Sequence, residues 1–280
     1  MSTRRSAVLL ALPCLLVLAA LFVAPQGLML EASLGRRSAY GGVIHAWSLD
    51  SYRRALEPIY LAILARSVAL ALATTLVCLV LAYPVAYWLG RHAPPRARSA
   101  LLVLVILPFW TSFLVRMYAW IFMLRTEGLV NTLLAHVGIG PLNLLYNDGA
   151  VLLGQVYGEL PFMILPLYAS LERLDRSLLE AAADLGAGPA RALWRVTLPL
   201  SRPGIVAGSV LVFIPSLGAY LAPDLLGGAR TMYMGSLIQG QFAVVRDAPF
   251  GAALSFLLSL VVVLLLLVLF RRPLRESRGA

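Results

Sequence analysis

Six apolar stretches dominate this chain, and each is long enough to cross a lipid bilayer. A spanning helix needs about 20 consecutive, mostly apolar residues. The stretches cover residues 8–30, 61–89, 100–124, 150–171, 204–226 and 251–270. Because 60% of the 280 residues are hydrophobic and only 13% are charged, a water-soluble fold would lack the polar surface to cover its core. The sequence predicts an all-α integral membrane protein, with one transmembrane domain of about six helices over residues 1–280.

The first stretch has features of both a signal peptide and a membrane span. Arg4 and Arg5 precede it, as in the charged start of a signal peptide. It is long for a signal peptide, however, and Pro25 follows Ala24 where a cleavage site would be expected. We therefore expect an uncleaved span.

The basic residues predict the orientation. All 23 are arginine, and the formal net charge is +10. Arg66 and Arg116 lie within the apolar stretches and the other 21 lie outside them, which indicates membrane orientation and not nucleic-acid binding. With the N-terminus inside, seven arginines fall on the outer side and fourteen on the inner side, so we expect both termini to be cytoplasmic. The inner set is Arg4, Arg5, Arg91, Arg96, Arg98, Arg173, Arg176, Arg191, Arg195, Arg202, Arg271, Arg272, Arg275 and Arg278.

Residues that carry redox, metal or nucleotide chemistry are scarce. A P-loop needs a lysine on the nucleotide phosphates, and this chain has no lysine, so it cannot be a standard P-loop ATPase by itself. Cys14 and Cys78 lie within apolar stretches, where cysteine behaves as a small hydrophobic residue. His45, His92 and His136 are scattered along the chain. We expect no catalytic residue, no metal site and no cofactor.

Proline and glycine occur inside several predicted spans. A broken helix is tolerated in a membrane where other helices or a watery cavity satisfy the freed backbone groups. Such breaks often line the solute path of a transporter, although each can also be a simple packing kink. The residues are Pro84, Pro108, Pro161, Pro166, Pro215 and Gly218.

The inner loop 172–203 predicts two short helices at an angle. Residues 174–185 form an amphipathic pattern that Gly186 would end, because glycine adopts the left-handed conformation without strain. Pro189 suits the first position of a second helix, which Pro199 and Pro203 would end. The run 181–183 of three alanines leaves one flank small enough for a partner surface to approach closely.

This loop resembles the "EAA" motif of binding-protein-dependent ABC importer permeases. Leu193 stands where that family often has phenylalanine, a mild departure. The resemblance implies a type I ABC importer permease fold and a loop that docks on a cytoplasmic ABC ATPase dimer. It also implies a second permease subunit and a solute-binding protein as partners. The residues that it assigns to ATPase coupling are Glu180, Ala181, Ala182, Gly186, Leu193 and Pro199.

Further segments resemble the spermidine/putrescine permeases of the B/H type, which pair with a different permease chain. These segments are 107–111, followed by Arg116 and Tyr118, and 160–163, 165–168, 223–228 and 246–250. The resemblance implies import of polyamines across a bacterial inner membrane. Permeases for ferric ion, phosphonates or opines share parts of these segments, so another solute remains the alternative.

Polyamines are flexible polycations, and a path for them needs carboxylates and aromatic faces. Glu159 lies within a predicted span, where a charge costs roughly 2.5–3.5 kcal/mol on insertion scales and usually faces a cavity or a partner. The candidate path residues are Glu159, Gln155 one turn before it, Asp224, Tyr220 and Trp110.

Each candidate also has a structural interpretation. Glu159 can be protonated or paired with Arg116, Asp224 can cap a loop or contact the binding protein, and Trp110 can serve packing alone. A proton-coupled carrier or a membrane enzyme that uses Glu159 is the rival class. The coupling motif and the scattered His and Cys residues speak against it.

Overall fold

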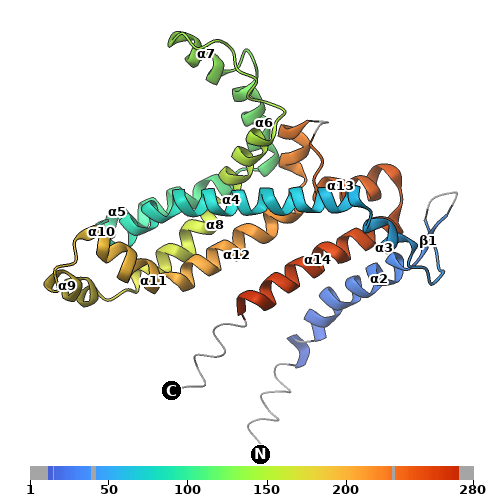
Figure 1. Cartoon of the computed structure of the whole chain (residues 1–280), viewed down its shortest axis with the longest axis horizontal. Helices are drawn as coiled ribbons and strands as arrows, with labels where there is room; N and C mark the ends of the chain where they lie inside the picture. Colours follow the sequence, from blue (N-terminus) through green and yellow to red (C-terminus); the bar gives the residue numbers. More distant parts are fainter. Residues whose placement is uncertain (1–11, 15, 39–41, 229–230, 271–280) are drawn as a thin grey trace, which may run out of the picture. The chain divides into compact units, whose positions relative to one another are not determined.

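The computed structural model describes residues 12–14, 16–38, 42–228 and 231–270 (Figure 1). The chain divides into two compact units, Met1–Leu64 with Leu237–Ala280, and Ala65–Ser236. Several predictions fall outside the described residues. These concern Arg4, Arg5, Arg230, the start of the predicted span 8–30, and the tail arginines Arg271, Arg272, Arg275 and Arg278.

Helices long and apolar enough to cross a membrane number four among the described residues, or up to six if two bent pairs each count as one span. The pair that starts at Pro95 bends by 89°, and the pair that starts at Pro189 bends by 66°. The four helices are Leu12–Ser33, Pro58–Arg91, Asp148–Glu172 and Ala248–Leu267.

The unit formed by the two chain ends packs α14 against α2 and α3. The Arg54 guanidinium donates to the Asp247 carboxylate at 3.0 Å and lies 4.0 Å from the centre of the Phe250 ring. The Asp247 side chain is only 8% exposed, so this ion pair holds the start of α14 against α3. The elements here are η1 (Ala19–Val23), α2 (Ala24–Ser33), β1 (Arg36–Arg37), β2 (Val43–Ile44), α3 (Asp50–Ala55), η5 (Gln241–Val245) and α14 (Ala248–Phe270).

The unit Ala65–Ser236 is built on three helices, α4 (Pro58–Arg91), α8 (Asp148–Glu172) and α12 (Arg202–Gly218). Their buried side chains form one apolar core, and α8 and α12 run side by side (Figure 1). Further elements are α5 (Pro95–Ile106), η2 (Leu107–Trp110), α6 (Phe113–Leu124), α7 (Leu129–His136), α9 (Arg176–Asp184), α10 (Pro189–Ala192), η3 (Leu193–Thr197), α11 (Leu198–Leu200) and η4 (Pro223–Gly227). The helix α13 (Met234–Gly240) begins at the end of this unit.

Glycines bring α8 and α12 into close contact. A Cβ atom on Gly204 would lie 2.8 Å from the carbonyl oxygen of Pro166 and 2.6 Å from the Cβ of Ser170. A Cβ atom on Gly208 would lie 2.7 Å from the Met163 sulfur. Small residues allow helix backbones to approach in this way in membrane proteins.

The apolar stretch 100–124 covers two helices and the break between them. The 3₁₀ turn η2 starts with Leu107 and Pro108, and α6 begins at Phe113 after an extended residue. Gly218 likewise ends α12. Pro84, Pro161, Pro166 and Pro215 lie inside helices that continue past them, so Pro108 and Gly218 alone among the singled-out residues stand at a break.

Candidate functional site

The helix α9 begins and ends with local hydrogen bonds. The Asp175 carboxylate accepts the backbone N–H of Ser177 at 3.0 Å and caps the start. At the other end Gly186 has φ +76, its N–H donates to the Ala183 carbonyl, and the Ala187 N–H donates to the Ala182 carbonyl. This is a Schellman ending, in which glycine takes the left-handed position. Gly186 therefore ends α9 as the sequence analysis predicted.

The Asp175 cap has an electrostatic consequence. The hydrogen bond from the Ser177 backbone N–H favours the charged carboxylate and lowers the pKa of Asp175 below its ordinary value. The side chain is exposed, so the effect is local to the first turn of α9.

The second part of the loop begins at Pro189, as predicted, and contains a π turn that was not predicted. A π-helical turn, η3, follows α10, and α11 then carries the chain to Leu200. The helix therefore ends between Pro199 and Pro203, as predicted, and the chain bends by 66° before α12. Pro199 occupies the first turn of α11 after the π turn, a position where proline's missing N–H costs little. Pro203 likewise lies in the first turn of α12.

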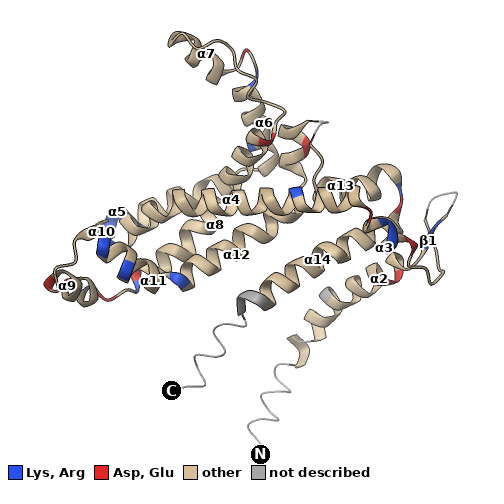
Figure 2. Cartoon of the chain, viewed as in Figure 1, with Lys and Arg blue, Asp and Glu red and all other residues tan. Residues whose placement is uncertain are grey.

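Apolar side chains are exposed on this pair of helices. Leu185 is 89% exposed and Trp194 is 67% exposed, and Leu178 on α9 is also exposed. We use the term coupling element for residues 172–203. Figure 2 shows acidic residues on α9 and basic residues around α5, α10 and α11 at the same end of the unit.

The predicted coupling residues lie on the two helices of this element. Glu180 and Ala181 are exposed on α9, and Ala182 is half-buried. Leu193 starts η3 and is half-buried, as is Pro199 in α11.

Both ends of the coupling element are tied to the α4–α5 region. Arg91 donates from Nη1 to the Leu174 carbonyl oxygen at 2.7 Å, and Arg98 pairs with Glu172 at 2.9 Å. At the exit, the Ser201 and Tyr83 hydroxyl oxygens lie 3.1 Å apart. The element is therefore held at its entry and its exit.

Sequence reasoning placed Arg91 and Arg98 on the inner side and missed this anchoring role. Their partners lie 83 and 74 residues away in the chain, so no local pattern indicates the contacts. The cluster of arginines between two spans was the available signal, and it predicted orientation only.

Helices α6 and α8 cross at two glycines of α8. A Cβ on Gly158 would lie 2.9 Å from the Phe113 ring, and one on Gly154 would lie 3.2 Å from the Met117 sulfur. This close crossing places Arg116 of α6 near Glu159 of α8.

Arg116 and Glu159 are close without forming an ion pair. Among the described residues, no carboxylate lies within 4.0 Å of the Arg116 guanidinium. Glu159 Oε2 is buried without a hydrogen-bond partner, and so are Nε and Nη1 of Arg116. Gln155, only 3% exposed, has an unpartnered Nε2 atom one turn earlier on α8. The structure therefore does not contain the Glu159–Arg116 ion pair considered from the sequence.

The remaining candidate path residues lie at breaks in helices. Trp110 ends η2 and is 83% exposed. Tyr220 lies just after α12, and its carbonyl oxygen accepts the N–H of Asp224 at 2.9 Å. Asp224 is exposed on η4, which packs on α6 and α8. Within the described part of the chain, no hydrogen bond or ion pair joins Asp224 or Tyr220 to Glu159, so the structure gathers only Glu159 and Gln155 of the predicted set.

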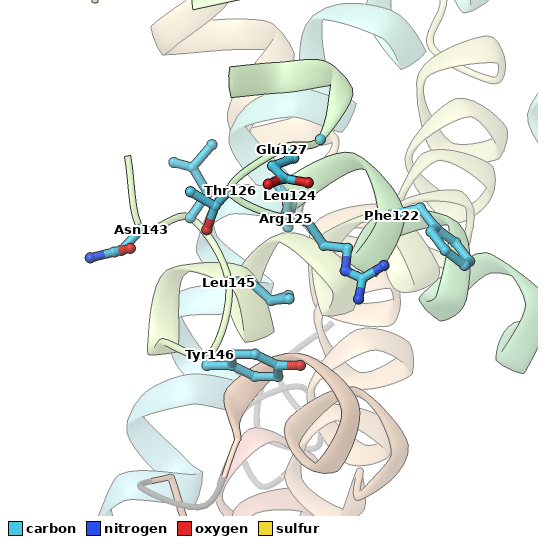
Figure 3. Close-up of a pocket in the computed structure, with 10 residues that line it drawn as sticks. Phe122, Leu124, Arg125, Thr126, Glu127, Asn143, Leu145 and Tyr146 are labelled. Carbon is cyan, nitrogen blue, oxygen red and sulfur yellow. The ribbon is translucent and has the colours of Figure 1, made fainter. Parts of the chain in front are cut away.

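A separate cavity of about 560 Å³ lies where α6 leads into α7. Arg125, Thr126, Glu127, Asn143 and Tyr146 contribute to its lining, and Figure 3 shows their side chains around it. No predicted path or coupling residue lines this cavity.

Comparison with known proteins identifies the class. Residues 82–275 match the family described as "Binding-protein-dependent transport system inner membrane component". The chain belongs to this family and is an inner-membrane transport subunit with an all-α permease fold.

Individual relatives are consistent with this class. The chain is 43% identical to the spermidine/putrescine transport system permease protein PotB of Escherichia coli K12 over 249 residues, which is 88% of this chain and 90% of that protein. PotB of Haemophilus influenzae is 39% identical over 249 residues, covering 88% and 87%.

A solved structure extends the comparison to the fold. It is a bacterial ABC transporter involved in the import of the acidic polysaccharide alginate. It matches with a TM-score of 0.72 and 16% identity, over 99% of this chain and 98% of the matched chain.

Proposed function

We propose that this chain is the membrane subunit that translocates polyamines in an ATP-driven importer. The observation that carries the ATP-driven part is the coupling element, which exposes Leu185 and Trp194 while being anchored at both ends. Exposed apolar side chains on a rigidly held surface suit a protein partner. The proposed partner is the cleft of a cytoplasmic ABC ATPase, in a dimer of two such subunits.

The anchoring supports a mechanical role for the coupling element. A pull on α9 acts on Leu174 and Glu172, which are bonded to Arg91 and Arg98. The exit of the element leads directly into α12, whose glycines touch α8. ATP-driven closure of the ATPase dimer would thus move α8 and α12 together and change the access to the path between them and the companion subunit.

Similarity to two PotB proteins supports polyamines as the solutes. Glu159 supplies a carboxylate that suits a cationic solute. Its carboxylate sits at the α6–α8 crossing with an unsatisfied oxygen that could accept an ammonium N–H. Gln155, Trp110, Tyr220 and Asp224 are the further residues proposed for the path. A solute-binding protein would deliver the polyamine, and a second, different permease chain would complete the path. In this arrangement both termini are cytoplasmic.

Transport assays on the assembled complex test which solute is imported. Proteoliposomes with the ATPase, both permeases and the binding protein should take up labelled putrescine or spermidine only when ATP is present. Excess phosphonate, ferric ion or opine should not compete. ATP-dependent uptake of one of these solutes, with no uptake of polyamines, would show that the importer carries that solute instead. The importer class would then still hold.

Two further measurements test the importer class. Glu180→Lys in the coupling element should keep the protein in the membrane while abolishing uptake driven by ATP. Crosslinkers placed at Ala182 or Ala183 should capture an ATPase subunit. Transport by the purified chain alone along a proton gradient would instead favour a secondary carrier.

A further inference from the structure

Three aromatic rings surround the guanidinium group of Arg116. Its central carbon lies 5.4 Å from the ring centres of Phe109 and Phe113 and 5.8 Å from that of Tyr157. A cation within about 6 Å of an aromatic ring is attracted by the negative face of the ring. The three rings, which we call the aromatic box, therefore form a cation site that the chain's own arginine occupies.

Arg116 is held in the box without the hydrogen bonds that a buried guanidinium normally makes. Its Nε and Nη1 atoms are buried and unpartnered. Leaving such groups unpaired is costly, which makes the position of Arg116 easier to vacate than a bidentate ion pair would be. For comparison, Arg66 on α4 donates to both carboxylate oxygens of Asp148 at 2.8 Å.

The unpaired acceptor lies near the guanidinium that fills the box. Glu159 is on α8, the helix that also supplies the Tyr157 ring, and its Oε2 atom is buried and unpartnered. An ammonium group in the box would meet aromatic faces and a carboxylate that needs a donor. An ammonium carries three N–H donors on a compact head, so it suits this combination.

We propose that Arg116 is a tethered competitor of the solute. At rest its guanidinium fills the aromatic box, and an arriving ammonium group displaces it and donates to Glu159. This inference rests on the proposed function, because it requires a cationic solute. It assigns Phe109, Phe113 and Tyr157 to the solute path and makes Arg116 the residue that sets the apparent affinity.

The main test measures the KM for ATP-dependent spermidine uptake by the full complex in proteoliposomes and compares the wild type with variants of Arg116 and Arg125. Arg116→Met removes the competitor and should lower the KM by about threefold to tenfold. Arg125→Met is the matched control, since Arg125 follows the last residue of α6 and its guanidinium carbon lies 5.7 Å from the centre of one ring, that of Phe122. It should leave the KM unchanged. An unchanged or higher KM in Arg116→Met would overturn the proposal.

A double substitution distinguishes two explanations, binding of the ammonium group in the box and simple charge repulsion by Arg116. If the ammonium binds in the box, Tyr157→Leu should raise the KM strongly in the Arg116→Met background and less in the wild-type background. Equal effects in both backgrounds would show that Arg116 acts only through its charge, and would overturn the proposal.

Arg116→Lys is a second variant that tests the proposal even where Arg116→Met fails to fold. It keeps the charge with a different head group and should give a KM between those of the wild type and Arg116→Met; a KM at or above the wild-type value would contradict the proposal. Absence of polyamine uptake by the wild-type complex would refute the proposed function itself, which is a distinguishable result.

Discussion

Arg91 donates a 2.7 Å hydrogen bond to the carbonyl oxygen of Leu174, a residue 83 positions further along the chain. The bond joins the end of α4 to the entry of the coupling element. A displaced coupling element therefore acts on α4 as well as on α8, to which it is covalently continuous.

Replacing Arg91 by Met should weaken coupling between ATP hydrolysis and uptake. Loss of one hydrogen bond from a charged donor should lower the number of solutes moved per ATP by about threefold to tenfold. The measurement is the ratio of uptake to ATP hydrolysis in proteoliposomes. Arg96→Met is the control, because Arg96 is an exposed residue at the start of α5, five positions from Arg91. Equal ratios in the two variants would contradict the anchoring role.

Gly186→Ala should loosen the end of α9. Nothing lies within 4 Å of an added Cβ, so the expected cost of about 1–2 kcal/mol comes from the left-handed backbone at φ +76. Hydrogen exchange over residues 180–188 should become faster, and coupling should fall. Gly188→Ala has equal space and a φ of −64, so it should have little effect. Similar exchange in both variants would refute the backbone argument.

The Asp175 cap predicts a pH dependence at the start of α9. Because the folded-state pKa of Asp175 is lowered, its stabilising effect is present above the unfolded pKa of about 3.9 and is lost as pH falls through the lower folded pKa. Exchange at residues 176–179 should accelerate in that acid range in the wild type. Asp175→Asn caps without titrating and should lack this step. The same acid step in both proteins would exclude Asp175 as its origin.

Gly204→Ala should destabilise the α8–α12 contact. The new methyl group would overlap the Pro166 carbonyl and Ser170, which costs typically 1–3 kcal/mol. The unfolding temperature of the purified complex in detergent should fall. Gly218→Ala, with open space around it, should not lower this temperature. A stable Gly204→Ala variant would mean that the helices can separate without cost.

Glu159→Gln should raise the KM for polyamines and leave assembly with the ATPase unchanged. The amide keeps the shape and loses the charge that attracts an ammonium group. Because charged hydrogen bonds contribute about 1.5–3 kcal/mol, a rise of at least tenfold is expected. Glu57→Gln, an exposed carboxylate outside the proposed path, is the control. An unchanged KM would remove Glu159 from the path.

Local signals in the sequence predicted the local features of the fold. Gly186 and Pro189 have conformational preferences that do not depend on the rest of the chain, and both stand where predicted. Pro199 and Pro203 likewise flank the end of the second helix at Leu200, as predicted. The π turn Leu193–Thr197 before Pro199 was not predicted, because no local sequence rule indicates it.

Contacts between distant residues could not be predicted in the same way. The Arg98–Glu172 pair depends on how α5 meets the end of α8. Phe113 is one turn before Arg116, so its proximity follows from helix geometry, but Tyr157 reaches the same guanidinium from α8. Glu159 was found because a charge in an apolar span is conspicuous, whereas aromatic rings in such spans are not.

The close contact at Gly204 has a consequence for how a movement of α12 is passed to α8. Long side chains between two helices can change rotamer and so absorb a small shift of one helix relative to the other. At Gly204 the backbone of α12 lies against the Pro166 carbonyl oxygen and the Cβ of Ser170 on α8 without such a layer. A movement that enters α12 at Arg202 should therefore be passed with little loss to α8, the helix that carries Glu159.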